Sequence, residues 1–417
     1  MAAQRTAISL FSGCGGDTLG LERAGYKVIA FSEFMPCAIA SHHANFPDSV
    51  HLVGGLVTKS PPGDDSGAVK PAAGGAGEAA DDSSAVKPKA KAKGRKAAAD
   101  PTSIVNIEDA VFAAYRGKAD VIFAGFPCQG FSKAGKKDSA DPRNQMFRHF
   151  VRAAAAIQPR FIIGENVVGL TSMRSGPAET DPLMLDLIRA AFREAGYELT
   201  HKILEATDFG VPQKRKRIVL VGWRVGEAFD AAAFWTAVTA AGAERTMPAM
   251  RSFVTASLEG ALLLPPAVIP ENFAEYALPI PEATEQTGEP HPYLALKAGE
   301  GLLSCSKRVS PFHSEIVDLD APSKTIICTY DHQPRLYVGL LKPSGAAYAR
   351  CLLPDELKQI QGFPADYVVE GNWKEKVVQI GNAVPPPMIE CVAGALEAGV
   401  ALRAKPKARR PKFIADD

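Results

Sequence analysis

Cysteine is scarce in this sequence, and its seven cysteines are neither paired along the chain nor clustered. No Cys-x-x-Cys pair is present, and no cysteine has the spacing to a histidine that a zinc site needs. An odd number of scattered thiols excludes a disulfide framework and indicates a reducing compartment. We therefore expect an intracellular protein without a metal. The cysteines are Cys14, Cys37, Cys128, Cys305, Cys328, Cys351 and Cys391.

Long apolar runs and an excess of one charge are also missing. No apolar stretch approaches the roughly 20 residues that span a bilayer, so we expect no membrane partner. Forty-seven basic residues against 46 acidic ones leave a net charge of +1. Total charge therefore does not reveal a polyanionic partner, and a nucleic-acid surface would have to come from local clustering. The 417 residues suffice for two or three domains with a large core.

One internal segment, residues 58–103, has few large apolar side chains and consists mainly of Ala, Gly, Pro, Ser, Asp and Lys. Such a segment cannot bury enough apolar surface to offset its ordering entropy, so we predict a disordered insertion in a surface loop. Its basic half, 87–96, could attract phosphate or serve as a nuclear-localisation-like run, and a solvated tether is an equally good interpretation. Residues 403–417 form a second basic stretch, which we expect to be a flexible tail.

The N-terminal stretch predicts a strand, a glycine-rich turn and a helix. Residues 7–11 are apolar, Ser12 to Gly16 follow at once, and a short helix is expected over 17–24. This order lets backbone amides approach a ligand, although a tight turn without a ligand fits equally well. The next strand ends at Glu33, where doubly wound sheets commonly place an acceptor for ribose hydroxyls.

Two later buried strands also end at side chains that can do chemistry. The run 121–125 leads through Pro127 to Cys128, at the strand end where open α/β sheets bind ligands. Simple packing is the commoner role of a free cysteine. The strand 161–164 leads to Glu165, whose partial desolvation would suit proton donation, while a helix N-cap is the alternative. Four cations at 214–217 precede the apolar strand 218–223.

The remaining pattern predicts helices over 104–115 and 146–157. From 225 to 349 the alternation of helices and strands is lost, and prolines crowd 248–292, which indicates a second, smaller and irregular domain. Ordered elements return with a short helix near 357–361 and a helix from 388 to about 402.

Taken together these stretches resemble the cytosine-5 DNA methyltransferases, and seven short motifs occur in the order typical of that family. They cover nearly the whole chain except the insertion, the variable part of the second domain and the tail. The motifs are Phe11–Gly16, Gly125–Ser132, Glu165–Val167, Gln213-x-Arg215-x-Arg217, Pro322–Ile326, Gln361–Pro364 and Gln379–Pro385.

The resemblance implies an α/β fold, with a Rossmann-like S-adenosylmethionine-dependent methyltransferase domain built on a doubly wound, mostly parallel sheet. It also implies a smaller, irregular target-recognition domain. On this basis we expect a catalytic and cofactor-binding domain over 1–224, the target-recognition domain over 225–350, and a C-terminal segment over 351–402 that returns to the catalytic domain beside residues 7–25.

The resemblance further implies the chemistry. S-adenosylmethionine would be the methyl donor, and the acceptor would be carbon 5 of a cytosine flipped out of a specific double-stranded DNA sequence by a monomeric enzyme. Cys128 would add to carbon 6, Glu165 would donate a hydrogen bond or proton to ring nitrogen 3, and Arg215 and Arg217 would hold the base and a phosphate. The implied cofactor residues are Phe11, Gly13, Gly15, Glu33, Pro127, Asn382 and Val384, and the implied substrate residues are Gln129, Ser132 and Gln213.

The chain departs from the family pattern at Gly54-Gly55-Leu56, where many relatives carry Gly-Asp-Ile. The usual acidic contact to the adenine amine is therefore missing, and we expect either that Glu108 or Asp109 replaces it from beyond the insertion or that adenine recognition is weaker. Met35 stands where Asp or Asn is frequent.

Two other functions compete with DNA methylation. One is methylation of a transfer RNA cytosine, which the absence of a Cys-Phe-Thr signature disfavours. The other is a catalytically silent DNA-binding relative, which the intact Cys128, Glu165 and Arg217 disfavour. The expected location is the nucleus in a eukaryotic or virus-infected eukaryotic host, and the cytoplasm or nucleoid in a bacterium.

Overall fold

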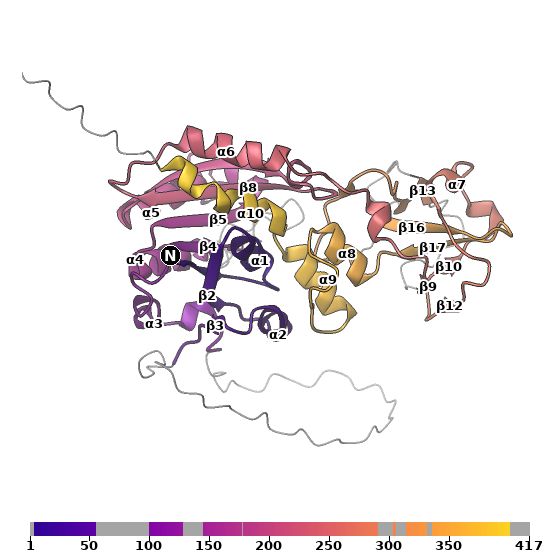
Figure 1. The fold of residues 1–417 in the computed structure, drawn as a ribbon, viewed down its shortest axis with the longest axis horizontal. Helices are drawn as coiled ribbons and strands as arrows, with labels where there is room; N and C mark the ends of the chain where they lie inside the picture. The colour runs from indigo at the N-terminus through magenta and orange to yellow at the C-terminus, as the bar shows by residue number, and fades with distance from the viewer. Residues whose placement is uncertain are drawn as a thin grey trace, which may run out of the picture.

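The computed structural model describes residues 4–55, 100–127, 145–176, 178–290, 303–305, 314–331 and 336–400. Two β-sheets lie one after the other along the long axis of the molecule, with helices α8 (Pro354–Ile360) and α9 (Trp373–Asn382) between them (Figure 1). The predictions for Cys128, Gln129, Ser132, most of the insertion and the tail lie outside the described residues.

The larger sheet has seven strands in the order β3-β2-β1-β4-β5-β8-β6. Strand β8 runs antiparallel to both of its neighbours, β5 and β6, and the other strands are mutually parallel. This confirms the predicted α/β class with a doubly wound, mostly parallel sheet. The strands are β1 (Arg5–Leu10), β2 (Tyr26–Ser32), β3 (Val50–His51), β4 (Val121–Ala124), β5 (Phe161–Val167), β6 (Tyr197–Glu205) and β8 (Lys216–Arg224).

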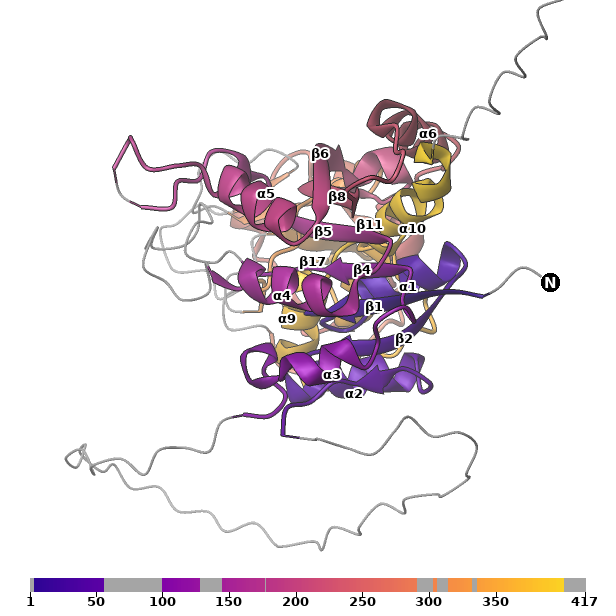
Figure 2. The same cartoon turned by 90° about the vertical axis from the view of Figure 1, so that its left-hand side faces the viewer.

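Helices cover both faces of this sheet. Figure 2 shows α3, α4 and α5 on one side and α1 and α10 on the other. In α4, Phe147, Phe150, Ala154 and Ile157 are buried at helical spacing, as the sequence predicted for 146–157. The covering helices are α1 (Gly16–Arg23), α3 (Asp109–Ala113), α4 (Phe147–Ile157), α5 (Met184–Glu194), α6 (Ala231–Ala243) and α10 (Pro386–Gly394), and α2 (Pro36–Asn45) follows β2.

Two helix predictions were too long. In place of one helix over 104–115, a 3-10 turn (Ile104–Asn106) and α3 are separated by Ile107 and Glu108 in extended conformation. Arg152 donates to the carbonyls of Ile104 and Ile107, so these two groups do not accept the bonds of a continuous α-helix. The C-terminal helix ends at Gly394, and a 3-10 turn (Leu396–Gly399) follows.

The second sheet occupies the region that we expected to be irregular. Its order is β10-β17-β16-β14-β13, with β11 also beside β16. The strands are β10 (Leu262–Leu263), β11 (Leu278–Pro279), β13 (Leu303–Cys305), β14 (Ser314–Ile316), β16 (Leu336–Leu341) and β17 (Ala347–Cys351). Helix α7 (Phe273–Tyr276) and the paired strands β9 (Leu258–Glu259) and β12 (Gln286–Thr287) lie nearby. Strand β15 (Ser323–Lys324) pairs with β7 (Gln213–Lys214), which directly precedes β8 of the larger sheet. The other 3-10 turns are Val168–Thr171, Ala206–Phe209, Met250–Phe253 and Pro266–Val268.

The packing divides the chain differently from the predicted boundaries at 224 and 351. Helix α6 lies within 225–350, yet its Phe234 and Val238 are buried in the same core as strand β8 of the larger sheet. Conversely, Leu357 and Ile360 of α8 share a core with the second sheet. The reason is that each of these two helices buries its apolar face against the sheet that it contacts, and not according to its position in the sequence.

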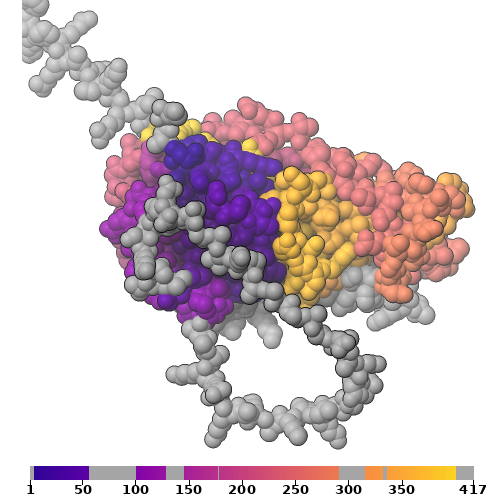
Figure 3. Space-filling model, turned by 60° about the horizontal axis from the view of Figure 1, so that its bottom comes forward, coloured from indigo at the N-terminus to yellow at the C-terminus, as the bar shows by residue number. Residues whose placement is uncertain are grey.

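The C-terminal segment lies against the N-terminal turn and helix. Tyr367 Oη donates to the carbonyl of Cys14 at 2.5 Å, across 353 positions of sequence. A Cβ at Gly16 would lie 2.5 Å from the carbonyl oxygen of Val384, and one at Gly20 would lie 2.7 Å from that of Pro386. Only glycines allow α1 this close an approach. Figure 3 shows the N-terminal indigo and the C-terminal yellow atoms in contact on one face.

Neither a membrane span nor a metal cluster is found in the described part of the chain. None of its helices is long and apolar enough to cross a bilayer. The same residues include no group of three His, Cys, Asp or Glu side chains placed to hold a metal ion.

Candidate active site

The candidate site lies where the strand order reverses, between β1 and β4. Open α/β sheets bind ligands at such a switch point, beyond the carboxyl ends of the strands. Strand β1 ends in the glycine turn, and β4 ends at the segment that leads to Cys128. Phe11 has a φ of 55°, unusual for a residue with a side chain, and Gly13 and Gly15 have φ values of 54° and 89°.

Glu33, the predicted ribose acceptor, holds this turn together. Its carboxylate accepts three backbone N–H groups, those of Gly13, Phe34 and Met35, each at 2.9 Å. Bonds from backbone amides fix the orientation of the carboxylate. Glu33 therefore ties the glycine turn after β1 to the end of β2, which brings two of the predicted cofactor elements together.

Phe34, directly after Glu33, was missed by the sequence reasoning. Its ring is 59% exposed, which is unusual for phenylalanine at the end of a buried strand. The backbone carbonyl of Phe34 accepts from Thr102 Oγ1 at 3.5 Å. An aromatic residue immediately after the strand-end carboxylate was the signal that could have singled it out.

The structure gives other partners to the two acids that we expected at the adenine. The Glu108 carboxylate accepts from the backbone N–H of Gly55 at 3.1 Å, and Asp109 forms an ion pair with Arg152 at 2.9 Å. Instead, the chain returns from the insertion beside Gly54, whose N–H donates to the Pro101 carbonyl at 2.7 Å. The exposed Asp100 thus lies near the position where relatives carry their acid.

The segment after β4 runs between the glycine turn and Glu165. A Cβ at Gly125 would lie 3.9 Å from both Glu165 Oε2 and the Phe11 carbonyl oxygen. Phe126 is buried, and its carbonyl accepts from Asn166 Nδ2 at 2.9 Å. Pro127 is half-buried at the end of the described segment.

Glu165 and Arg217 form an ion pair at this site. Arg217 Nε lies 2.8 Å from Glu165 Oε1, and the two side chains are 14% and 12% exposed. Arg217 also donates from Nη1 to the carbonyl of Lys216. The pairing of β5 with β8 brings together two residues that the sequence placed in separate motifs.

Gln213 and Arg215 require a correction, because both are fully buried. Gln213 Nε2 donates to Gln361 Oε1 at 2.5 Å, and its Oε1 accepts from the Ile326 N–H at 3.0 Å. Arg215 donates to two backbone carbonyls. Side chains enclosed in this way do not face a substrate, so we replace the predicted substrate contact of Gln213 and the predicted base or phosphate contact of Arg215 with positioning roles.

The last predicted residues, Asn382 and Val384, come from the far end of the chain. Asn382 is exposed at the end of α9, and Val384 is buried against α1 through its contact with Gly16. Of these two residues, Val384 thus lies against the start of α1, directly after the glycine turn.

Asp17, in the first turn of α1, is a buried carboxyl group that the sequence reasoning did not single out. Ser9 Oγ donates to its Oδ2. Burial raises the pKa of Asp17 to about 7, against a lowering contribution from the Ser9 hydrogen bond. An acidic residue directly after a glycine turn was the available signal.

The described cysteines with shifted pKa values are poor nucleophiles. Burial raises the pKa of the Cys14 and Cys351 thiols to about 12, and it also raises the pKa of Cys37 and Cys391. Because the thiolate is the reactive form, none of these four is activated. Cys14, the one in the glycine turn, is therefore a packing residue.

A seven-stranded sheet of this order, with a glycine turn and a carboxylate at the neighbouring strand end, defines a Rossmann-like methyltransferase domain. The family model of the C-5 cytosine-specific DNA methylases matches residues 5–57, 91–256 and 310–398. The chain belongs to this family, and it is a DNA (cytosine-5) methyltransferase. The family and the fold imply the use of S-adenosylmethionine.

Individual proteins agree with this assignment. The chain is 28% identical over 399 residues to the type II methyltransferase M1.HphI of Haemophilus parahaemolyticus, covering 94% of this chain and 86% of that protein. It is 26% identical over 417 residues to the type II methyltransferase M.DdeI of Desulfomicrobium norvegicum, covering 93% and 87%. The crystal structure of the S. pombe Dnmt2 methyltransferase superposes with a TM-score of 0.54 at 14% identity, covering 94% of this chain and 98% of that one, and shares the fold.

Proposed function

We propose that this enzyme methylates carbon 5 of a cytosine in a specific duplex DNA sequence, with S-adenosylmethionine as the methyl donor and Cys128 as the covalent nucleophile. The observation that carries the proposal is the position of Glu165. Its carboxylate is held by Arg217 and lies beside Gly125, three residues before Cys128, and close to the glycine turn. The acid, the glycine turn and the end of the strand that leads to Cys128 thereby come from separate strands of the sheet.

The residues at the glycine turn fit the cofactor. No atom lies within 4 Å of where a Cβ at Gly13 would stand, and Ser12 Oγ is buried without a partner among the described residues. The cofactor, when bound, supplies an electrophilic sulfonium methyl group. We assign its binding to Phe11, Gly13, Gly15, Glu33, Pro127, Asn382 and Val384.

For the adenine end we propose Phe34 and Asp100 in place of Glu108 and Asp109. The Phe34 ring offers an exposed stacking face. Asp100 Oδ1 accepts from the N–H and hydroxyl of Thr102, which holds the carboxylate in place and lowers its pKa. Its second oxygen is then available to accept from an amine.

The chemistry assigned to the chain begins with a nucleophile. Cytosine is electron-poor at carbon 6 and unreactive at carbon 5, so the Cys128 thiolate adds first and makes carbon 5 carbanion-like. Glu165 donates a hydrogen bond or proton to ring nitrogen 3 as the adduct forms, a step that requires its carboxyl group to be protonated once the base is bound, and Arg217 orients that group. After carbon 5 has gained its methyl group, a base removes the carbon 5 proton and the thiolate leaves. Base flipping exposes the target at a cost of about a few kcal/mol.

We assign recognition of the DNA sequence to the second sheet and its loops, with the enzyme acting as a monomer on duplex DNA inside the cell. The type II methyltransferases among its relatives favour a role in bacterial restriction–modification. Bisulfite sequencing of DNA from a host that expresses the chain would identify the modified sequence.

A methyl-incorporation assay that compares duplex DNA with transfer RNA tests the proposal. We expect label in the duplex alone. Label in RNA alone would favour the RNA methyltransferase, and a fluorocytosine-containing duplex that traps no covalent adduct in the presence of cofactor would favour a silent DNA-binding relative.

A further inference from the structure

Two arginines, Arg215 and Arg350, are the largest fully buried side chains in the described residues, with exposures of 1% and 0%. Burying a guanidinium costs free energy unless a carboxylate and hydrogen bonds compensate for lost water. The two arginines differ in how this cost is met, and the difference indicates what each one does.

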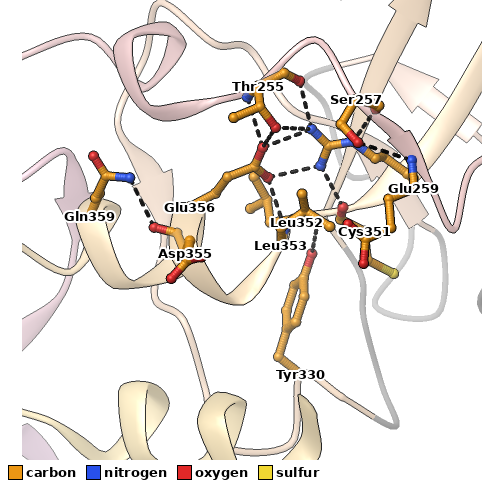
Figure 4. Close-up of polar contacts among 11 residues, drawn as sticks. Thr255, Ser257, Glu259, Tyr330, Cys351, Leu352, Leu353, Asp355, Glu356 and Gln359 are labelled. Atoms are coloured by element: carbon orange, nitrogen blue, oxygen red, sulfur yellow. Dashed lines mark hydrogen bonds and ion pairs between the residues drawn. The ribbon is translucent and has the colours of Figure 1, made fainter. Parts of the chain in front are cut away.

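Arg350 has a complete set of partners. Its Nη1 and Nη2 lie 2.8 and 2.7 Å from the two carboxylate oxygens of Glu356. Further bonds reach the carbonyls of Thr255, Ser257 and Cys351, which Figure 4 shows converging on this group. This neutral, saturated cluster joins α8 to the second sheet and has the character of a structural joint.

Arg215 has no such compensation. Nη1 donates to the carbonyl of Ile326 and Nη2 to that of Gly381, both at 3.0 Å. Its Nε has no partner, and no carboxylate lies within ion-pair distance of it in the described part of the chain. Burial lowers the pKa of Arg215, the positive charge of Arg217 lowers it further, and the negative charge of Glu165 opposes this lowering. A cation kept buried at this cost is a candidate for a functional role.

The two carbonyls that Arg215 bridges belong to segments with different roles. Gly381 immediately precedes Asn382 in the assigned cofactor site. Ile326 is buried in the same hydrophobic core as the second sheet. The next residue, Ile327, is 43% exposed. A Cβ at Gly381 would lie 2.4 Å from the Cys328 nitrogen and 2.5 Å from the Ile327 carbonyl carbon. The two segments therefore meet backbone to backbone.

A second set of hydrogen bonds joins the same two segments. Gln213 accepts from the Ile326 N–H and donates to Gln361, which in turn donates to the carbonyl of Ala383. Ile326 is thus held at its N–H by Gln213 and at its carbonyl by Arg215. Two residues after Arg215, the same stretch of chain carries Arg217, the partner of Glu165.

We propose that Arg215 is a positioning residue that couples cofactor binding to DNA binding. The proposal rests on the proposed function, since it takes the Asn382 segment as part of the cofactor site. A cofactor that orders Gly381 and Asn382 also fixes the guanidinium of Arg215. Through that group it fixes the Ile326 segment, which packs with the second sheet. Lysine keeps the charge but lacks the planar fork that holds two carbonyls at once.

The test is a binding cycle with S-adenosylhomocysteine as the cofactor probe and a fluorescent duplex that the wild-type enzyme methylates. The coupling factor is the ratio of DNA Kd values without and with the probe. For the wild type we expect about fivefold or more. Arg215→Lys should bring the factor to about one while the Kd of S-adenosylhomocysteine alone changes by less than about threefold. Arg251→Lys, in an exposed ion pair with Asp320, is the control and should keep the wild-type factor.

An unchanged factor in Arg215→Lys, or no coupling in the wild type, would overturn the proposal. If Arg215→Lys does not fold, Thr325→Val tests the proposal in its place. Its hydroxyl donates to the Lys214 carbonyl at the exposed edge of the same junction, so its loss should reduce the factor, and a wild-type factor would again contradict us. Failure of the proposed function is seen separately, as absence of methylation by the wild-type enzyme on any duplex.

Discussion

Arg217 Nε lies 2.8 Å from Glu165 Oε1, on strands β8 and β5 of the larger sheet. In the antiparallel register Arg217 faces Val167 and Glu165 faces Val219, so the pair is diagonal across the two strands. Both side chains are largely buried, which strengthens the interaction relative to a surface pair. The carboxyl group is therefore oriented before substrate binds.

Glu165→Gln should lower kcat by about 10²- to 10⁴-fold, because the amide keeps the shape but cannot transfer a proton. The KM for the cofactor should change little, since Glu165 is not among the assigned cofactor residues. Steady-state methylation of duplex DNA measures both values. Glu227→Gln removes the carboxylate of the half-exposed pair with Arg160 and is the matched control. A Glu165→Gln enzyme with more than about a tenth of wild-type kcat would remove the residue from its role.

Cys128→Ser should abolish methylation and leave cofactor binding intact, because a hydroxyl is a far weaker nucleophile than a thiolate. Radiolabel transfer and cofactor titration check the two parts. Cys37→Ser, at a half-buried thiol of α2, should retain full activity. Retained turnover in Cys128→Ser would show that another residue attacks the base.

Asp17→Asn should stabilise the protein in a pH-dependent way. The pKa of this carboxyl group is raised from 3.8 to about 7 in the folded chain, so the folded state holds a proton that the unfolded state has lost between these values. The free energy of unfolding therefore falls as the pH rises from about 4 to 7. The variant should gain about 4 kcal/mol at pH 8 and a little over a third of that at pH 5. Urea unfolding at both pH values measures this difference, and an equal gain at the two would exclude titration of Asp17 as the cause.

Phe34→Ala and Asp100→Asn should each raise the KM for S-adenosylmethionine by about tenfold, the effect of losing one stacking or hydrogen-bond contact. kcat at saturating cofactor should stay close to that of the wild type, since both residues are assigned to the adenine end. Asp109→Asn, which only loses the ion pair with Arg152, provides the comparison. If Asp109→Asn raises the KM and Asp100→Asn does not, Asp109 and not Asp100 is the acidic residue that contacts the adenine amine.

Glu356→Gln should destabilise the protein by about 3–5 kcal/mol, because it leaves the Arg350 guanidinium buried without its carboxylate. Adding Arg350→Met should recover part of this loss, since two uncharged groups no longer need compensation. The midpoints of urea unfolding for the single and double variants provide the measurement. A double variant less stable than Glu356→Gln would show that the hydrogen bonds of Arg350 matter more than its charge.

Local sequence predicted the elements whose signals are strong and short in range. The strand that leads to Glu33, the strand that carries Glu165, and the helix with buried Phe147 and Phe150 follow from apolar runs and helical spacing. The continuous helix over 104–115 failed because Arg152, a residue from another helix, draws on the carbonyls of Ile104 and Ile107. Such a tertiary contact leaves no mark on local periodicity.

By itself the sequence determined the family, the α/β class and the motifs that bear the chemistry, because spacing along the chain is enough to recognise them. Only the tertiary structure decided which side chains are enclosed by the rest of the protein. Arg215 and Arg217 are indistinguishable in the motif, yet one is enclosed between Ile326 and Gly381 while the other holds Glu165. Burial and partnership depend on segments that lie far apart along the chain, such as Gly381, which is 166 positions from Arg215, and this information exists only once the chain is packed.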